Sequence, residues 1–242
     1  MRASRWLLLA CAGLFAACTT VSPTTDLTEP QIVPATETTQ ATIPPEVSWT
    51  VIGDNLALSP TWMDSTVRMD FDMQLTETAL IAQAGSEAYA NPINTAGPRI
   101  EFEQGFGVSF EMEMLSGDFA GISLYGSLSE GEWWQGIRRL DIGAKSGNVA
   151  IGYWDGSSAT PIVWNEYPTS GIYGNHAFTL GVRATRNEFI VLKNGHEIGR
   201  MTNPDLFASG EVLLGLNVAP ENQLTLYTLF VEAPDGNGVT IK

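Results

Sequence analysis

Short runs in which apolar and polar side chains alternate restrict the fold of this chain more than any other feature. In VSFEMEM, residues 108–114, every second side chain is apolar, and FTLGV, residues 178–182, repeats the pattern. Successive side chains of a strand point to opposite faces of its sheet, so each run predicts a strand with one buried face. The best helical candidate, NPDLFASG at residues 203–210, would make only about two turns.

Turn signals separate these runs at intervals typical of a β-sandwich. EFIVLKNGHEIGR, residues 188–200, predicts a hairpin with Asn194-Gly195 at its turn, because a two-residue primed turn needs positive φ. LTLYTLFVE, residues 224–232, supplies a closing strand, and other turn signals lie at residues 145–148, 155–156 and 220–222. This spacing predicts an all-β, two-sheet antiparallel jelly-roll sandwich over residues 46–242.

The N-terminal residues carry export information. Residues 1–17 hold two arginines and then an apolar run, residues 6–17, that is too short to span a bilayer, so we interpret them as a signal peptide. Phe15-Ala16-Ala17-Cys18 resembles the lipobox of bacterial lipoproteins. That resemblance implies a lipidated Cys18 and an exported domain, anchored to the cell envelope and facing its extracytoplasmic side. The alternative is an ordinary secretory signal cleaved near Ala16 or Ala17.

Residues 18–45 read as a tether. From residue 19 the segment is rich in threonine and proline and contains neither lysine nor arginine. Too few of its side chains are apolar to offset the entropy of ordering, and the prolines favour extended conformers. We expect a disordered spacer between the membrane anchor and the folded domain.

Charge and cysteine content exclude several classes of function. The chain has 27 acidic and 12 basic side chains, and its formal net charge of −15 disfavours nucleic acids and anionic lipid headgroups as partners. Cys11 would leave with the signal and Cys18 would carry lipid. The mature domain would then have no thiol for a disulfide, a thiolate metal site or a cysteine nucleophile.

Aromatic side chains gather in one part of the domain. Of the six tryptophans that follow Trp6, four lie between residues 133 and 164. Adjacent residues of a strand face opposite ways, so one ring of each adjacent pair should point out of the core. Outward rings suit the flat C–H faces of sugars, which predicts a carbohydrate-binding surface, whereas the alternative is that the rings fill the core. The candidate residues are Trp133, Trp134, Arg138, Tyr153, Trp154, Trp164 and Tyr167, with Arg139, Asp141 and Asp155 among the polar residues between them.

Three longer segments carry a family resemblance: FGVSFEMEMLSGDFAGISLYG, HAFTLGVRATRNEFIVLKNGHEIGR and GEVLLGLNVAPENQLTLYTLFVEAP. They resemble the concanavalin A-like lectin/glucanase jelly roll, in its laminin-G-like and 3-keto-disaccharide-hydrolase-like branch. The chain is also similar to modules that precede catalytic domains in secreted polysaccharide-degrading enzymes such as xylanases. These resemblances concern the fold, and a fold does not by itself carry a function.

The same resemblance shows where an enzyme would carry its acids. Glucanases of this superfamily project acidic residues from one strand into the cleft, and a retaining pair stands about 5–5.5 Å apart. Glu111 and Glu113 share a strand face, but Ser109 and Leu115 stand where a third acid would be expected. A glycoside hydrolase, or an ancillary module of such an enzyme, with Glu111 and Glu113 as the acid pair is therefore the alternative function.

Other chemistry has weaker support. The laminin-G-like resemblance implies calcium as a candidate ligand, with Asp118, Glu132 and Asp155 as loop carboxylates, and no other cofactor is expected. His176 and His196 lack metal-ligand spacing, and no G-x-S-x-G, P-loop or H-E-x-x-H motif occurs. We expect a noncatalytic, surface-anchored lipoprotein that binds a polysaccharide. The glycoside hydrolase is the first alternative, and a sandwich that docks a protein partner is the second.

Overall fold

The computed structural model of the chain describes residues 47–64, 71–85, 98–115, 118–127, 136–169, 172, 176–185, 188–202, 207–236 and 238–242. All of them lie in the compact unit Pro45–Lys242. The expectations for the signal peptide, for Cys18 and for the tether fall outside these residues. Within the described ranges, no helix is long and apolar enough to cross a membrane.

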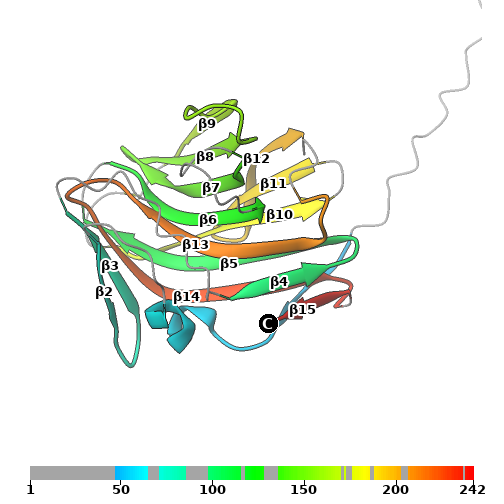
Figure 1. Ribbon diagram of the computed structural model, residues 1–242, viewed down its shortest axis with the longest axis horizontal. Coiled ribbons are helices and arrows are strands. Elements are labelled where there is room, and N and C mark those ends of the chain that lie inside the picture. The colour runs from blue at the N-terminus through cyan, green and yellow to red at the C-terminus, as the bar shows by residue number, and fades with distance from the viewer. Residues whose placement is uncertain are drawn as a thin grey trace, which may run out of the picture. The chain divides into compact units, whose positions relative to one another are not determined.

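Two antiparallel sheets pack against each other, as the alternating runs predicted (Figure 1). Sheet A has the strand order β12-β11-β10-β5-β14-β3-β2, with β1 also paired to β14. Its strands are β1 Trp49–Ile52, β2 Phe71–Leu75, β3 Leu80–Ala84, β5 Gly105–Met114, β10 Phe178–Thr185, β11 Glu188–Lys193, β12 His196–Thr202 and β14 Gln223–Pro234.

Sheet B has the order β15-β4-β13-β6-β7-β8-β9. Its strands are β4 Arg99–Phe102, β6 Ala120–Ser127, β7 Arg138–Lys145, β8 Asn148–Trp154, β9 Val163–Pro168, β13 Glu211–Val218 and β15 Val239–Ile241. Two short 3₁₀ helices, η1 Leu56–Leu58 and η2 Pro60–Asp64, follow β1. The expected all-β jelly-roll sandwich is confirmed.

The core lies between the two sheets and is lined by the apolar side chains of the alternating runs. On β5, Val108, Phe110, Met112 and Met114 are buried, while the side chains between them point outward. β10 contributes Phe178, Leu180 and Val182 to the same core. Full burial of a side chain of this size stabilises the fold by about 1.5–3 kcal/mol. The apolar residues that recur at every second position in these runs are therefore the ones that form the core.

Positive φ angles confirm the predicted turns. Asn194 and Gly195 have φ of 50° and 77° and join β11 to β12. Ser146 (49°) and Gly147 (83°) join β7 to β8, and Glu221 (59°) lies between β13 and β14. Two expectations were incomplete. The described part of the helical candidate, residues 207–210, forms a turn and a bend, and the three-residue β15 follows the strand that we expected to close the fold.

A bulge in β14 is filled by a distant asparagine. The pairing of β14 with β5 shifts between Leu226 and Thr228, and β14 pairs with β3 only up to Leu226 and with β1 only from Val231. In the gap, Asn55 donates from Nδ2 to the carbonyl of Tyr227 (2.9 Å) and accepts through Oδ1 from the N–H of Leu229 (2.9 Å). One side chain thus replaces a missing strand partner, as buried backbone groups require.

Replacing Asn55 should therefore destabilise the domain more than its size suggests. We expect Asn55→Ala to lower the free energy of unfolding by about 2–4 kcal/mol, because backbone groups of β14 lose their partners. Urea denaturation measures this loss. Asn148→Ala is the control. The Asn148 side chain donates a hydrogen bond to the exposed Glu166, so its loss should change the free energy of unfolding by about 0.5 kcal/mol or less. Equal losses in both variants would contradict the role given to Asn55.

Candidate functional site

The candidate site lies on the face of sheet B that points away from the core, called here the outward face of sheet B. Residues in register share a face of a sheet. Tyr125 of β6 pairs with Arg139 of β7, which pairs with Trp154 of β8. The next row is Ser123, Asp141, Gly152 and Trp164. Their chain neighbours, such as Leu124, Leu140, Ile151 and Tyr153, lie in the core instead.

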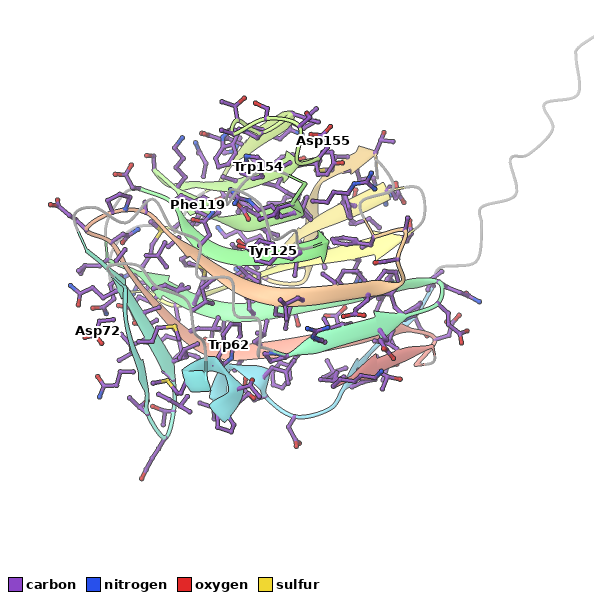
Figure 2. The ribbon with its side chains drawn as sticks, viewed as in Figure 1. Trp62, Asp72, Phe119, Tyr125, Trp154 and Asp155 are labelled. Carbon is purple, nitrogen blue, oxygen red and sulfur yellow. The ribbon has the colours of Figure 1, made fainter. Side chains whose placement is uncertain are left out.

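Three rings on this face contact one another and form what we call the aromatic group: Phe119, Trp154 and Trp164. The ring centroids of Trp154 and Trp164 are 6.2 Å apart at 82°, and those of Trp164 and Phe119 are 5.8 Å apart at 60°. Such edge-to-face contacts are a favoured geometry for aromatic pairs. Figure 2 shows Phe119, Tyr125 and Trp154 on this part of the molecule. The group joins the start of β6 to β8 and β9.

Hydrogen bonds hold both indoles in place. Trp154 Nε1 donates to the carbonyl of Ala159 at 3.3 Å, and Trp164 Nε1 donates to Glu166 Oε1 at 2.8 Å. The bond from the Trp164 indole is the first cause of the lowered pKa of Glu166, and Asn148 and Lys145 add to it. Glu166 therefore stays ionised and fixes the orientation of the Trp164 ring.

The indoles lie over a glycine. A Cβ added at Gly152 would come within 2.6 Å of a carbon in each of the Trp154 and Trp164 rings, a distance that real Cβ atoms do not adopt. Any larger residue would have to push the rings away from the sheet. Gly152 thus lets two large rings share one position on the sheet surface.

Cations flank the indoles. The Arg139 guanidinium carbon lies 4.1 Å from the Trp154 ring centroid, and Lys145 Nζ lies 5.1 Å from that of Trp164. Both distances are within the range of cation–π attraction. Trp154 is 8% exposed and Trp164 is half-buried. Of the two, the Trp164 ring is therefore the more accessible to a ligand.

A buried carboxylate lies beside the aromatic group. Asp141 accepts from Ser123 Oγ at 2.6 Å and from Asn217 Nδ2 at 2.7 Å, and Arg139 Nε lies 3.3 Å from its Oδ2. These partners come from β6, β13 and β7. Burial raises the pKa of Asp141, while the Arg139 charge and the two hydrogen-bond donors oppose that shift. The carboxylate thus connects three strands beneath the site, and Arg139 connects it to Trp154.

The structure brings together only part of the predicted carbohydrate surface. Trp154 and Trp164 share the outward face of sheet B, and the expectation that Tyr153 and Trp154 face opposite ways is confirmed. Tyr153 itself is a core residue. Tyr167 also packs against the core, and a Cβ at Gly199 of β12 would lie 2.1 Å from its ring. Tyr153 is therefore a correction, because it is buried in the core, whereas Tyr167 is half-buried, packs against the core and lies apart from the aromatic group.

Arg139, and not the expected Arg138, lies at the aromatic group. Arg138 is exposed at the start of β7, and the alternation of the strand turns Arg139 toward Trp154. Trp133 and Trp134 lie outside the described residues. Sequence reasoning missed Phe119, Ser123 and Asn217. Phe119 and Ser123 lie just before the segment in which the tryptophans cluster, Asn217 lies on the distant strand β13, and only pairing in register brings all three to the site.

The acid pair of the alternative function lies on the other sheet. Glu111 and Glu113 alternate with buried residues of β5 and so point outward from sheet A. Glu113 Oε2 accepts from the Tyr227 hydroxyl at 2.8 Å. The two carboxylates and the aromatic group therefore occupy the outward faces of different sheets, and one bound saccharide could not contact both.

Of the three carboxylates expected to bind calcium, the two in the described ranges, Asp118 and Asp155, are not part of a metal-binding cluster. Asp155 accepts from the N–H and the hydroxyl of Ser157 at 2.8 and 2.6 Å, which lowers its pKa. Asp118 is exposed, and Glu132 lies outside the described residues. In the ranges that the structure describes, no three His, Cys, Asp or Glu side chains gather as a metal site. His176 and His196 are both exposed.

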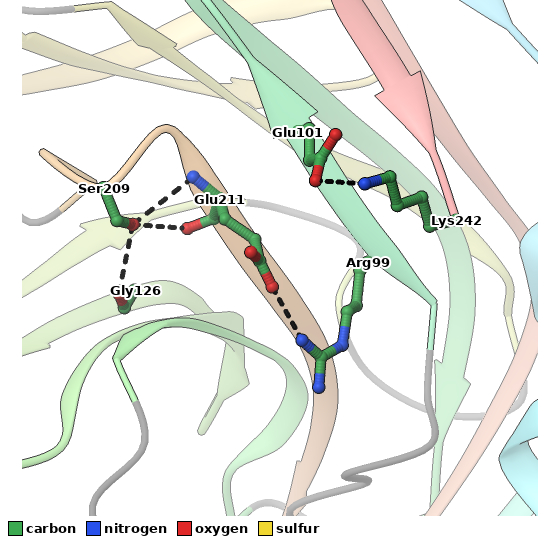
Figure 3. Close-up of polar contacts among 6 residues, drawn as sticks. All are labelled: Arg99, Glu101, Gly126, Ser209, Glu211 and Lys242. Carbon is green, nitrogen blue, oxygen red and sulfur yellow. Dashed lines mark hydrogen bonds and ion pairs between the residues drawn. The ribbon is translucent and has the colours of Figure 1, made fainter.

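The outward face of sheet B also has an open hollow of about 400 Å³ at the corner formed by β4, β13 and β15. Glu101, Glu211 and Thr240 are among its lining residues. Glu211 pairs with Arg99 at 2.8 Å, and Glu101 pairs with Lys242 (Figure 3). These ion pairs fix the side chains at the rim, and the exposure of the four residues keeps each pair weak.

Comparison with known proteins supports the fold. No protein-family model matches the chain, and no curated protein matches it. Among solved structures, the catalytic domain of an endo-1,3-β-glucanase (laminarinase) from Thermotoga petrophila superposes with a TM-score of 0.52 and 9% identity, covering 78% of this chain and 99% of that one. This likeness shows a shared fold and agrees with the concanavalin A-like resemblance at that level.

Two other solved structures are similar at lower scores. An endo-β-1,3-glucanase from Pyrococcus furiosus superposes with a TM-score of 0.48 and 11% identity, over 68% of this chain and 78% of that one. The carbohydrate-binding module CBM66 from Bacillus subtilis superposes with a TM-score of 0.43 and 15% identity, over 76% of this chain and 95% of that one.

The raised pKa of Asp141 predicts a pH dependence of stability. A carboxyl whose pKa is higher in the folded state binds its proton more tightly there, and this tighter binding stabilises the folded state. The stabilisation is fully present below the unfolded pKa of about 3.9 and is lost as pH rises through the folded pKa. The free energy of unfolding of the wild type should therefore fall relative to that of Asp141→Asn as pH increases. Urea denaturation at several pH values measures the difference. A difference that grows with pH would mean that Arg139 and the donors outweigh burial.

Proposed function

We propose that this chain is a noncatalytic polysaccharide-binding protein and that the outward face of sheet B carries its binding site. The observation that carries the proposal is the aromatic group, in which two hydrogen-bonded indoles and a phenyl ring lie beside Arg139 and Lys145. Saccharides offer flat C–H faces next to hydroxyl groups, and they bind to sites that combine rings with a few polar side chains.

A neutral polysaccharide is the class of ligand that we propose. The formal net charge of −15 would repel an acidic polymer at low ionic strength. The two cations of the site are already engaged, since Arg139 contacts Asp141 and Trp154, and Lys145 contacts Glu166 and Trp164. The laminarinase with the same fold is named for endo-1,3-β-glucan cleavage, so a 1,3-β-glucan is the natural first probe.

Binding without catalysis is proposed because the acid pair and the rings are separated. Glu111 and Glu113 project from sheet A, whereas the aromatic group lies on sheet B. On sheet B, Asp141 is buried and accepts from Ser123 and Asn217, which leaves it poorly placed to attack or protonate a bound sugar. Release of reducing sugar from a glucan, abolished by Glu111→Gln, would establish the hydrolase instead.

Loss of the more accessible indole should weaken binding. We expect Trp164→Ala to reduce affinity for laminarin, a soluble 1,3-β-glucan, by at least about tenfold, because covering a large ring contributes about 1.5 kcal/mol or more. Gly152→Ala should weaken binding as well, since it displaces both indoles without removing either. Isothermal titration calorimetry measures both.

The matched control for these variants is Phe230→Ala. Phe230 is a half-buried ring of β14 that points outward from sheet A, in register with Ser109. Its loss should leave the affinity unchanged. If Trp164→Ala, Gly152→Ala and Phe230→Ala all bind as the wild type does, the outward face of sheet B is not the site.

We also propose that the protein is exported and lipid-anchored through Cys18, with residues 18–45 as the tether. The Phe15-Ala16-Ala17-Cys18 sequence and the threonine- and proline-rich segment after it support this. Cys18→Ser should then abolish incorporation of labelled fatty acid and move the protein from the detergent phase to the aqueous phase in Triton X-114 partition. Cys11→Ser is the control and should change neither. Partition into the aqueous phase by the wild type would overturn the anchor.

A further inference from the structure

The Tyr125 hydroxyl is buried, and among the described residues no group meets hydrogen-bond geometry with it. The Tyr125 side chain is 2% exposed. Burial raises the pKa of Tyr125 and the nearby Ser123 hydroxyl lowers it, but Ser123 donates its own hydrogen to Asp141, so the Tyr125 hydrogen has no acceptor among these residues. A buried hydroxyl left unpaired costs about 1–3 kcal/mol, so folded proteins rarely keep one without a reason. The residue therefore carries a polar group that the fold itself does not use.

The neighbouring polar groups show that this is not a general fault of packing. Ser123, two residues earlier on β6, donates to Asp141, and Asn217 donates to the other oxygen of the same carboxylate. Trp154 Nε1 is bonded to Ala159. Poor local packing would leave several of these groups unpaired, yet Ser123, Asn217 and Trp154 each donate to an acceptor. The Tyr125 hydroxyl differs from them, because its hydrogen has no acceptor among the described residues.

Tyr125 lies beside the aromatic group. It is in register with Arg139, which is in register with Trp154, so these side chains stand next to one another on the outward face of sheet B. The Tyr125 ring packs with Ile137 and Leu213 in a small apolar cluster that is separate from the main core. A hydroxyl at the edge of an apolar cluster, beside Arg139 and two edge-to-face indoles, has the mixture of rings and a few polar groups that saccharide sites use.

The surrounding charges determine what the hydroxyl can bind. Burial, and after it the Asp141 carboxylate, raises the pKa of Tyr125, so the phenol keeps its proton and acts as a donor. The same carboxylate disfavours an incoming anion, and the guanidinium of Arg139 is already held between Asp141 and Trp154. The partner that fits is an uncharged acceptor oxygen.

We propose that Tyr125 is a specificity-determining residue of the site and donates its hydroxyl hydrogen to a hydroxyl or ring oxygen of a neutral saccharide bound at the aromatic group. This inference rests on the proposed function. The hydroxyl is buried in the unliganded protein, so the saccharide must displace the side chains packed around it, and association is slower than for a preformed open site. The bond formed then offsets the cost of the unpaired hydroxyl, which gives the site its preference for a correctly placed acceptor.

The test is Tyr125→Phe, which removes only the hydroxyl. We expect the affinity for laminarin, measured by calorimetry, to fall about threefold to tenfold, as loss of one neutral hydrogen bond predicts. The thermal midpoint of unfolding should stay the same or rise, because the fold loses no bond. Tyr227→Phe is the matched control: it removes a hydroxyl that is bonded to Glu113 on sheet A, and it should leave the affinity unchanged.

Each result has a distinct meaning. If the wild type binds neither laminarin nor any other neutral polysaccharide tested, the proposed function fails and this inference fails with it. If the wild type and Tyr125→Phe bind laminarin equally, only this inference is overturned. A lower thermal midpoint in Tyr125→Phe would also overturn it, since the hydroxyl would then have a structural partner such as buried water. Equal wild-type affinity for polygalacturonate and laminarin would overturn the preference for a neutral acceptor.

Discussion

The arrangement of the site depends on the contacts that the buried Asp141 carboxylate makes with its polar partners. The carboxylate accepts hydrogen bonds from β6 and β13 and lies against Arg139 of its own strand, and Arg139 in turn covers the Trp154 ring. A buried charge is costly unless all its partners are present, so loss of one partner would affect the others. The network therefore couples the order of three strands to the orientation of an indole.

The two outward faces of the sandwich differ in character because different residues occupy the outward positions of their strands. Sheet A presents Glu111, Glu113 and Tyr227, and the Tyr227 hydroxyl donates to Glu113. Sheet B has Gly152, which allows two indoles to lie on the sheet surface. A β-sandwich needs only its inner faces to fold, so its outer faces are free to acquire sites. Here the aromatic group lies on the outward face of sheet B, and the acid pair Glu111 and Glu113 lies on the outward face of sheet A.

Much of the fold was readable from local pattern. Alternation in residues 108–114 identified a strand and its buried face, and Asn194-Gly195 identified a hairpin, because both depend on residues close together in the chain. β15 escaped detection because three residues are too few to show a period. The bulge at Tyr227, which Asn55 fills, also escaped, because the two residues are 172 positions apart.

For the candidate site, the sequence by itself determined that large rings gather between residues 133 and 164 and that Tyr153 and Trp154 face opposite ways. Only the tertiary structure decided which ring of that pair faces outward, that Tyr167 packs against the core, and that Phe119, Ser123 and Asn217 join the site. The physical reason is that alternation along one strand fixes relative direction alone. The pairing of strands in register fixes which side chains from distant segments become neighbours.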